Sequence, residues 1–72
     1  MTHYKLSALI EREEKFYVAL CPELDIASQG ETLESALANL KEAVELYLES
    51  ADKSEIYLPK TPPFLTTLDI AV

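Results

Sequence analysis

The chain has 72 residues, of which 49% are apolar and 26% are charged. This composition is typical of a small globular domain and excludes a disordered segment. No apolar run approaches the roughly 18 residues of a membrane span, and the N-terminus has no basic region followed by an apolar one. We therefore predict a single cytoplasmic domain over residues 1–72.

The formal net charge at pH 7 is −7, from 13 acidic and 6 basic residues. A surface that binds nucleic acid directly needs the opposite sign, clustered on one face. A basic protein partner fits this charge better, although solubility alone would also account for it. We expect no direct contact with nucleic acid and no membrane contact.

Cysteine and histidine occur once each, as Cys21 and His3. One cysteine excludes an internal disulfide, and the pair cannot supply the ligands of a structural zinc site. No metal or cofactor is predicted. Because so short a chain buries a small core, self-association is the support that remains, and we expect a homo-oligomer.

The first part of the chain predicts two strands joined by a hairpin. Tyr4, Leu6, Ala8 and Ile10 recur at period 2, which indicates a half-buried strand. The polar residues 12–15 are a break of hairpin length. Residues 16–21 are apolar on both faces and predict a second, central strand.

Pro22 is expected to end the second strand, because proline cannot donate to a sheet ladder. A shorter third strand is predicted from Leu24 to Gln29, closed by Gly30. Gly30 is the only glycine, so it marks the position where a positive φ or a sharp reversal is expected.

A helix is predicted from about Thr32 to Glu49. Thr32 is a candidate N-cap, and Glu31 and Glu34 lie near the positive end of the helix dipole. Apolar residues recur with helical spacing at Leu33, Ala36, Leu37, Leu40, Ala43, Val44, Tyr47 and Leu48. Leu40 is in the middle of this stripe and is predicted to be central to the core. Leu46 falls outside the stripe and is a candidate oligomer contact.

The remaining residues predict a connection and a final strand. Residues 56–63 contain three prolines (Pro59, Pro62 and Pro63) and are expected to be extended. Leu65 to Val72 has good β propensity. An edge strand is a route to pairing with a second chain, which makes Leu68 and Ile70 candidate oligomer contacts.

The predicted fold class is α+β, with the order β-β-β-α-β and one helix packed on a face of a mixed four-stranded sheet. A helical crossover places the last strand parallel to the first, so the expected sheet order is 3-2-1-4.

No catalytic residue is predicted. Cys21 and His3 lack the third group that orients a base, and Cys21 is expected in the core. The element order is the first part of the RNase H-like order, whose nucleases hold two metal ions with acidic side chains. Glu42 and Asp69 lie on the predicted helix and last strand, but the first strand has no acid before Glu11. A metal-dependent nuclease is therefore only a third alternative.

Glu23 and Asp25 form a compact acidic pair between the second and third predicted strands. Such residues are ordinary in turns. They are also our candidates for contact with arginine or lysine of a basic partner.

Several motifs are similar to those of the HicB-like antitoxins of type II toxin–antitoxin systems. They are the strand sequences YKLSALIE and FYVALCPEL, followed by Ser28-Gln29-Gly30, Thr32, Ala36, Asn39, Glu42-Ala43 and Leu46-Tyr47-Leu48. The resemblance implies a partial RNase H fold without nuclease activity. It also implies a partner, a small basic HicA-like mRNA-cleaving toxin, whose active surface the antitoxin covers.

Two features depart from the family. Longer relatives have a proline-glycine-cysteine turn where this chain has Asp25-Ile26-Ala27, and they add a DNA-binding domain for which this sequence, ending at Val72, has no room. We expect the toxin-binding half alone, with no transcriptional domain. The predicted function is an antitoxin-like, homo-oligomeric binding module. The alternative is an orphan homo-oligomer without a toxin partner.

Overall fold

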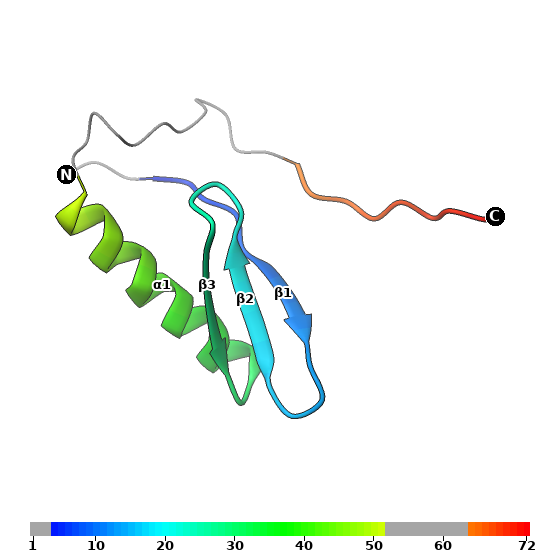
Figure 1. Ribbon diagram of the computed structural model, residues 1–72, viewed down its shortest axis with the longest axis horizontal. Coiled ribbons are helices and arrows are strands. Elements are labelled where there is room, and N and C mark those ends of the chain that lie inside the picture. The colour runs from blue at the N-terminus through cyan, green and yellow to red at the C-terminus, as the bar shows by residue number, and fades with distance from the viewer. Residues whose placement is uncertain (1–3, 52–63) are drawn as a thin grey trace.

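The computed structural model describes residues 4–51 and 64–72. Its elements are β1 (Leu9–Arg12), β2 (Tyr17–Cys21), β3 (Ile26–Gly30) and α1 (Leu33–Ser50). The strands form one antiparallel sheet of order β1-β2-β3, and α1 lies across one face of it (Figure 1). The α+β class is confirmed. His3 and the proline-containing connection 56–63 lie outside the described residues.

The hairpin between β1 and β2 forms at the polar break, as predicted. Arg12 pairs with Tyr17, and its guanidinium carbon lies 5.9 Å from the centroid of the Tyr17 ring. The backbone N–H of Glu13 then donates to the carbonyl of Phe16 at 2.8 Å. This bond closes the turn between β1 and β2.

The first strand begins later than predicted, at Leu9 and not near Tyr4. Leu9 is opposite Leu20, so the same register would bring Ser7 opposite Pro22. Pro22 has no N–H to donate, and β2 ends at Cys21 as expected. Residues 4–8 therefore precede β1 and are not paired with β2 as a strand.

The third strand also begins later than predicted, because Leu24 and Asp25 belong to the turn. Leu24 donates its N–H to the carbonyl of Cys21 at 3.3 Å, and Asp25 has a φ of 54°. Aspartate is among the few residues that tolerate this left-handed conformation.

Gly30 does not have the positive φ that is one of the two expected features, although the chain bends at residues 31 and 32 directly after it. It is the last residue of β3, and the first turn of α1 lies directly against it. A Cβ atom at this position would lie 2.5 Å from the backbone nitrogen of Ala36 and would also meet the Ser35 hydroxyl. The chain needs glycine here for close packing of strand and helix.

The helix agrees with the prediction to within one residue at each end. Thr32 is the N-cap, and its hydroxyl accepts the N–H of Ser35 at 3.0 Å while the Ser35 hydroxyl accepts the N–H of Thr32. This reciprocal capping box satisfies two of the free N–H groups of the first turn. Further along, the Asn39 amide donates to the carbonyl of Gln29 at 2.8 Å and ties α1 to β3.

The core is small and lies between α1 and the face of the sheet formed by β2 and β3. Its fully buried residues are Ala19, Cys21, Ala36 and Leu40. Leu40 has only 3% of its surface exposed, which confirms its predicted central place. Half-buried apolar residues surround it: Leu6, Ile10, Tyr17, Leu24, Ile26 and Val44.

The predicted fourth strand is not formed. Residues 64–72, hereafter the C-terminal arm, are extended and exposed and lie in no strand (Figure 1). The sheet of the described residues is therefore three-stranded, with the 3-2-1 part of the predicted order and without the fourth strand. β propensity favours an extended backbone, but a strand also needs a neighbour whose N–H and C=O groups face it.

Candidate functional site

The turn between β2 and β3 separates the two carboxylates predicted to bind a partner. Both carboxylate oxygens of Glu23 accept the backbone N–H of Ser7, each at 3.1 Å. Asp25, in contrast, is exposed. Glu23 is half-buried and engaged within its own chain, so only Asp25 presents a fully solvated carboxylate.

Opposing effects act on the Glu23 carboxyl. Partial burial raises its pKa, but the hydrogen bonds from Ser7 and from neighbouring groups together outweigh burial and lower the pKa below its usual value. These bonds stabilise the ionised form, so Glu23 is a charged acceptor that holds the segment before β1 against the turn.

Cys21 is buried in the core, as expected, and its thiol lies 3.5 Å from the nearer Glu23 carboxylate oxygen. Burial is the main cause that raises the pKa of the thiol; the Leu24 backbone lowers it, the adjacent Glu23 carboxylate raises it, and the net pKa lies above the usual value. A buried thiol with a raised pKa is a poor nucleophile.

One face of the sheet is not covered by α1. Ala19 and Cys21 of β2 point into the core, so their alternating neighbours Val18 and Leu20 point to the opposite side. A shallow hollow of about 250 Å³ is lined there by Leu9, Glu11, Val18, Leu20 and Ala27. We call the four apolar members of this set the open sheet face.

Acidic residues lie at one end of the open sheet face. Glu11 lines the hollow, and Glu13 and Glu14 follow in the hairpin between the basic residues Arg12 and Lys15, all exposed. An apolar patch bordered by charged residues is a common arrangement at protein-binding surfaces. This face therefore suits a protein partner with apolar and basic groups side by side.

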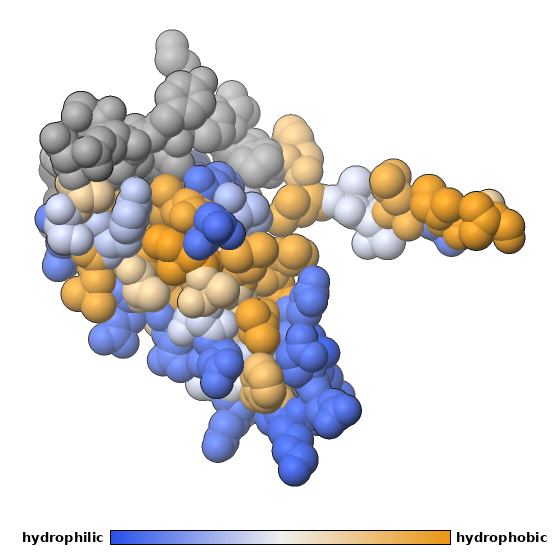
Figure 2. Space-filling view, in the orientation of Figure 1, coloured by the Kyte–Doolittle hydropathy of each residue, from blue (hydrophilic) through white to orange (hydrophobic). Residues whose placement is uncertain are grey.

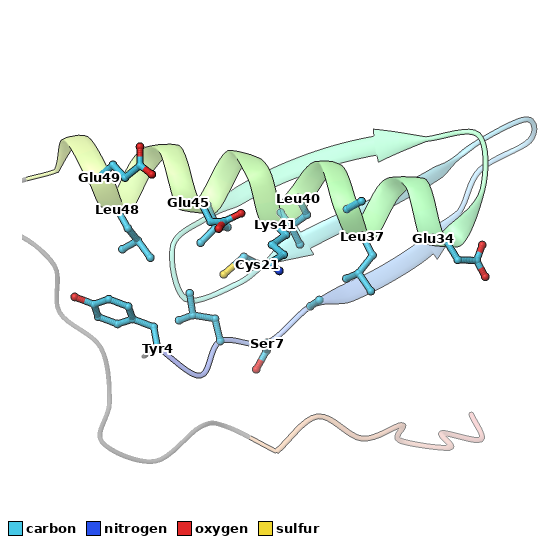
Figure 3. Close-up of a pocket in the computed structure, with 14 residues that line it drawn as sticks. Tyr4, Ser7, Cys21, Glu34, Leu37, Leu40, Lys41, Glu45, Leu48 and Glu49 are labelled. Atoms are coloured by element: carbon cyan, nitrogen blue, oxygen red, sulfur yellow. The ribbon is translucent and has the colours of Figure 1, made fainter. Parts of the chain in front are cut away.

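A larger depression of about 940 Å³ lies between α1 and residues 4–8 (Figure 3). We call it the α1 groove. Its apolar lining comes from Tyr4, Leu6, Ala8, Cys21, Leu37, Ala38, Leu40, Val44 and Leu48. Glu34, Lys41, Glu45 and Glu49 are charged residues along the same stretch of α1.

The predicted oligomer contacts are all exposed. Leu46 has 59% of its surface exposed and does not line the α1 groove. Leu68 and Ile70 are exposed to 78% and 69% and belong to the C-terminal arm, which projects away from α1 (Figure 1). The structure therefore does not gather the three residues on one element.

The acidic residues considered for a nuclease lie on three separate elements. Glu11 is on β1, Glu42 on α1 and Asp69 on the C-terminal arm, and all are exposed. Residues 4–51 and 64–72 contain no group of three or more His, Cys, Asp or Glu side chains that could hold a metal ion. In the same ranges, no helix is both long and apolar enough to cross a membrane.

Sequence reasoning missed the open sheet face, although a signal for it was present. Residues 16–21 are apolar on both faces, which we took to indicate a central strand. β2 is central, but a helix covers only one of its faces. When a single helix covers only one face of such a strand, the apolar residues on its other face indicate a second contact surface.

Comparison with known proteins gives three relatives of similar length. A UPF0150 protein from Helicobacter pylori is 40% identical over 68 residues, covering 92% of this chain and 94% of the relative. Two UPF0150 proteins from Synechocystis are 39% and 35% identical, covering 96% and 100% of this chain and 90% and 100% of the relatives. Neither a family model nor a solved structure matches the chain. At this identity and coverage, the chain belongs to the UPF0150 family.

Proposed function

We propose that this protein is a non-enzymatic, HicB-like antitoxin module that binds a small basic HicA-type mRNA-cleaving toxin in the cytoplasm. The observation that carries the proposal is the open sheet face, an apolar surface with Glu11 inside its hollow and Glu13 and Glu14 at its end. The HicB-like motifs and the net charge of −7 support it independently.

The partner would cover the side of the sheet that α1 leaves free. Leu9 and Ala27 are exposed there, while Val18 and Leu20 are half-buried between them. Apolar contact supplies affinity, and opposite charge raises the association rate. In this proposal the acidic contacts shift from the Glu23 and Asp25 turn to Glu11 and the hairpin, because Glu23 is already engaged with Ser7.

The proposal also includes the finer fold that HicB-like proteins share. A segment Leu65–Val72, from the same or a second copy of the chain, would complete the sheet as a fourth strand beside β1, which gives the partial RNase H-like arrangement. The three described strands and α1 have the order that this arrangement requires.

The test measures binding to the small basic protein encoded in the adjacent reading frame, with two matched charge reversals. Glu11→Lys changes the charge beside the open sheet face, and Glu42→Lys makes the same change on exposed α1, on the covered side of the sheet. We expect the association rate to fall about tenfold for Glu11→Lys at low salt and to change little for Glu42→Lys. Equal effects from both variants would mean that net charge acts without this surface.

Co-expression tests the proposed function in cells. The wild-type chain should restore growth to cells that express the basic partner, and Leu9→Lys should not. Purified chain with Mg²⁺ or Mn²⁺ should leave labelled RNA intact. Metal-dependent cleavage that disappears in Asp69→Asn would contradict the proposal.

A second candidate is an orphan homo-oligomer without a toxin partner. The exposed apolar C-terminal arm favours it, because such a segment needs a covering surface. No basic neighbouring gene, together with a stable oligomer of the chain alone, would favour this candidate.

A further inference from the structure

The α1 groove is open because α1 is displaced toward one side of the sheet. The helix packs over β3 and β2, while β1 lies at the sheet edge beyond it. The flank of α1 that faces β1 keeps its apolar residues without a strand beneath them, and Leu37 is 41% exposed. The predicted apolar stripe of the helix is therefore wider than the sheet that it covers.

The edge of β1 that runs beside this groove has free backbone groups. The N–H of Ser7 donates to Glu23 and that of Glu13 to Phe16, so odd-numbered residues direct their N–H groups inward. Because backbone direction alternates along an extended chain, the N–H and C=O groups of Leu6, Ala8 and Ile10 face outward. Among the described residues, β1 pairs only with β2.

The C-terminal arm has the properties of the missing strand. At period 2 one face of the arm carries Phe64, Leu68, Ile70 and Val72 with a single polar residue, Thr66, and the other face carries Thr67 and Asp69 with Leu65 and Ala71. The arm is extended, exposed and largely apolar, and it projects from the body (Figure 1 and Figure 2). It forms no strand pairing with residues 4–51.

The dimensions of arm and groove match. At about 3.3 Å per residue, residues 64–72 span roughly 30 Å. The groove follows α1 from Glu34 to Glu49, which is about 22 Å at 1.5 Å per residue. The arm is long enough to fill the groove with its apolar face while its other face stays in solvent.

We propose that the α1 groove binds the C-terminal arm of a second copy of this chain, in a reciprocal exchange. Each arm adds a strand to the free edge of β1 in the other copy and places Leu68 and Ile70 against Leu37, Val44 and Leu48. Such an exchange is a closed twofold assembly that leaves neither groove nor arm exposed. It also supplies the apolar burial that a chain of 72 residues lacks alone. The inference does not depend on the proposed toxin partner.

The oligomeric state of the full chain tests the exchange, through light scattering at micromolar concentration. The wild type should have twice the 8.1 kDa of one chain. Leu68→Lys on the apolar face of the arm and Leu37→Lys in the groove should each give monomers. The matched controls are Thr67→Lys on the other face of the arm and Leu46→Lys outside the groove, and both should remain dimers. A dimer that survives both Leu68→Lys and Leu37→Lys would overturn the proposal, as would a monomeric wild type.

A crosslinking experiment separates exchange from docking of each arm in its own groove. One tagged copy carries Leu37→Cys and a second copy carries Ile70→Cys, and a short bis-maleimide is added to their mixture; buried Cys21 is retained, and wild type is the control. Exchange predicts a crosslinked heterodimer of the two copies. A chain carrying both substitutions that crosslinks only within itself would overturn the proposal.

Salt separates this dimer from the proposed toxin complex. Each copy has a net charge of −7, so the two copies repel one another and added salt should strengthen the dimer. Binding of a basic partner should weaken under the same conditions. Loss of the dimer in Leu68→Lys with toxin binding intact would leave the proposed function standing.

Discussion

The carboxylate of Glu23 accepts the backbone N–H of Ser7 with both of its oxygens, at 3.1 Å each. The register of the sheet brings Ser7 opposite Pro22, where β2 has already ended, and the Glu23 side chain accepts the Ser7 N–H there. The Glu23 side chain thereby holds the segment before β1 in place beyond the end of β2. Ser7 and the groove residues beside it depend on one ionised carboxylate.

We predict that Glu23→Gln lowers stability at neutral pH and that the difference from wild type shrinks in acid. The folded-state pKa of Glu23 is lowered, so its stabilising effect is fully present above its unfolded pKa of about 4.3. The effect is lost as the pH falls through the lower folded value. Urea melts at neutral pH and at several acidic pH values measure it. Asp25→Asn, an exposed change in the same turn, is the matched control for loss of one carboxylate.

Leu40→Ala should destabilise the protein by about 2–5 kcal/mol, because it leaves a cavity in the centre of the core. Leu46→Ala removes the same atoms from an exposed position of the same helix and should change stability by less than about 0.5 kcal/mol under conditions where the chain is monomeric. Urea denaturation of both variants compares them directly. A cost below about 1 kcal/mol for Leu40→Ala would show that the core packing is wrongly assigned.

Gly30→Ala should destabilise the fold by about 1–3 kcal/mol through overpacking, since the new methyl group meets the backbone of Ala36. The φ of Gly30 is not positive, so backbone strain makes no contribution. Thermal melts of Gly30→Ala and of the exposed β3 change Gln29→Ala test this explanation. Removing the Ser35 hydroxyl as well should not restore stability, because the contact with the Ala36 nitrogen remains.

Cys21 should react slowly with a thiol reagent in the folded protein and rapidly in urea. Burial raises its pKa and hides the sulfur, so reaction requires opening of the core. The ratio of the two rates at mildly alkaline pH measures this protection. Leu40→Ala should increase the rate in the folded state, since it loosens the packing around the same cluster.

The helix was predictable because its signals are local. Thr32 caps the first turn and the apolar spacing continues to Leu48, so both ends follow from neighbouring residues. The hairpin at residues 12–15 is local in the same sense. Propensity and spacing along one segment were sufficient for these elements.

The strand limits were less predictable because pairing decides them. Alternation from Tyr4 is real, but β1 begins at Leu9 because the register brings Ser7 opposite Pro22. The alternation in the C-terminal arm predicts an extended segment. It does not indicate whether the strand that pairs with this segment belongs to the same chain or to a second copy. The sequence alone predicts Glu23 as a partner contact, because no pattern in it indicates that the Ser7 N–H needs an acceptor there.

The strand order has a consequence for the rate of folding. Each strand pairs with the one before it in the chain, and α1 packs on the strand that precedes it. Neighbouring elements close short loops, and proteins with such contacts fold fast. The body should therefore refold in a first-order phase that does not depend on concentration. An arm that reaches a second copy must follow in a slower, second-order phase, whose rate rises in proportion to the amount of protein.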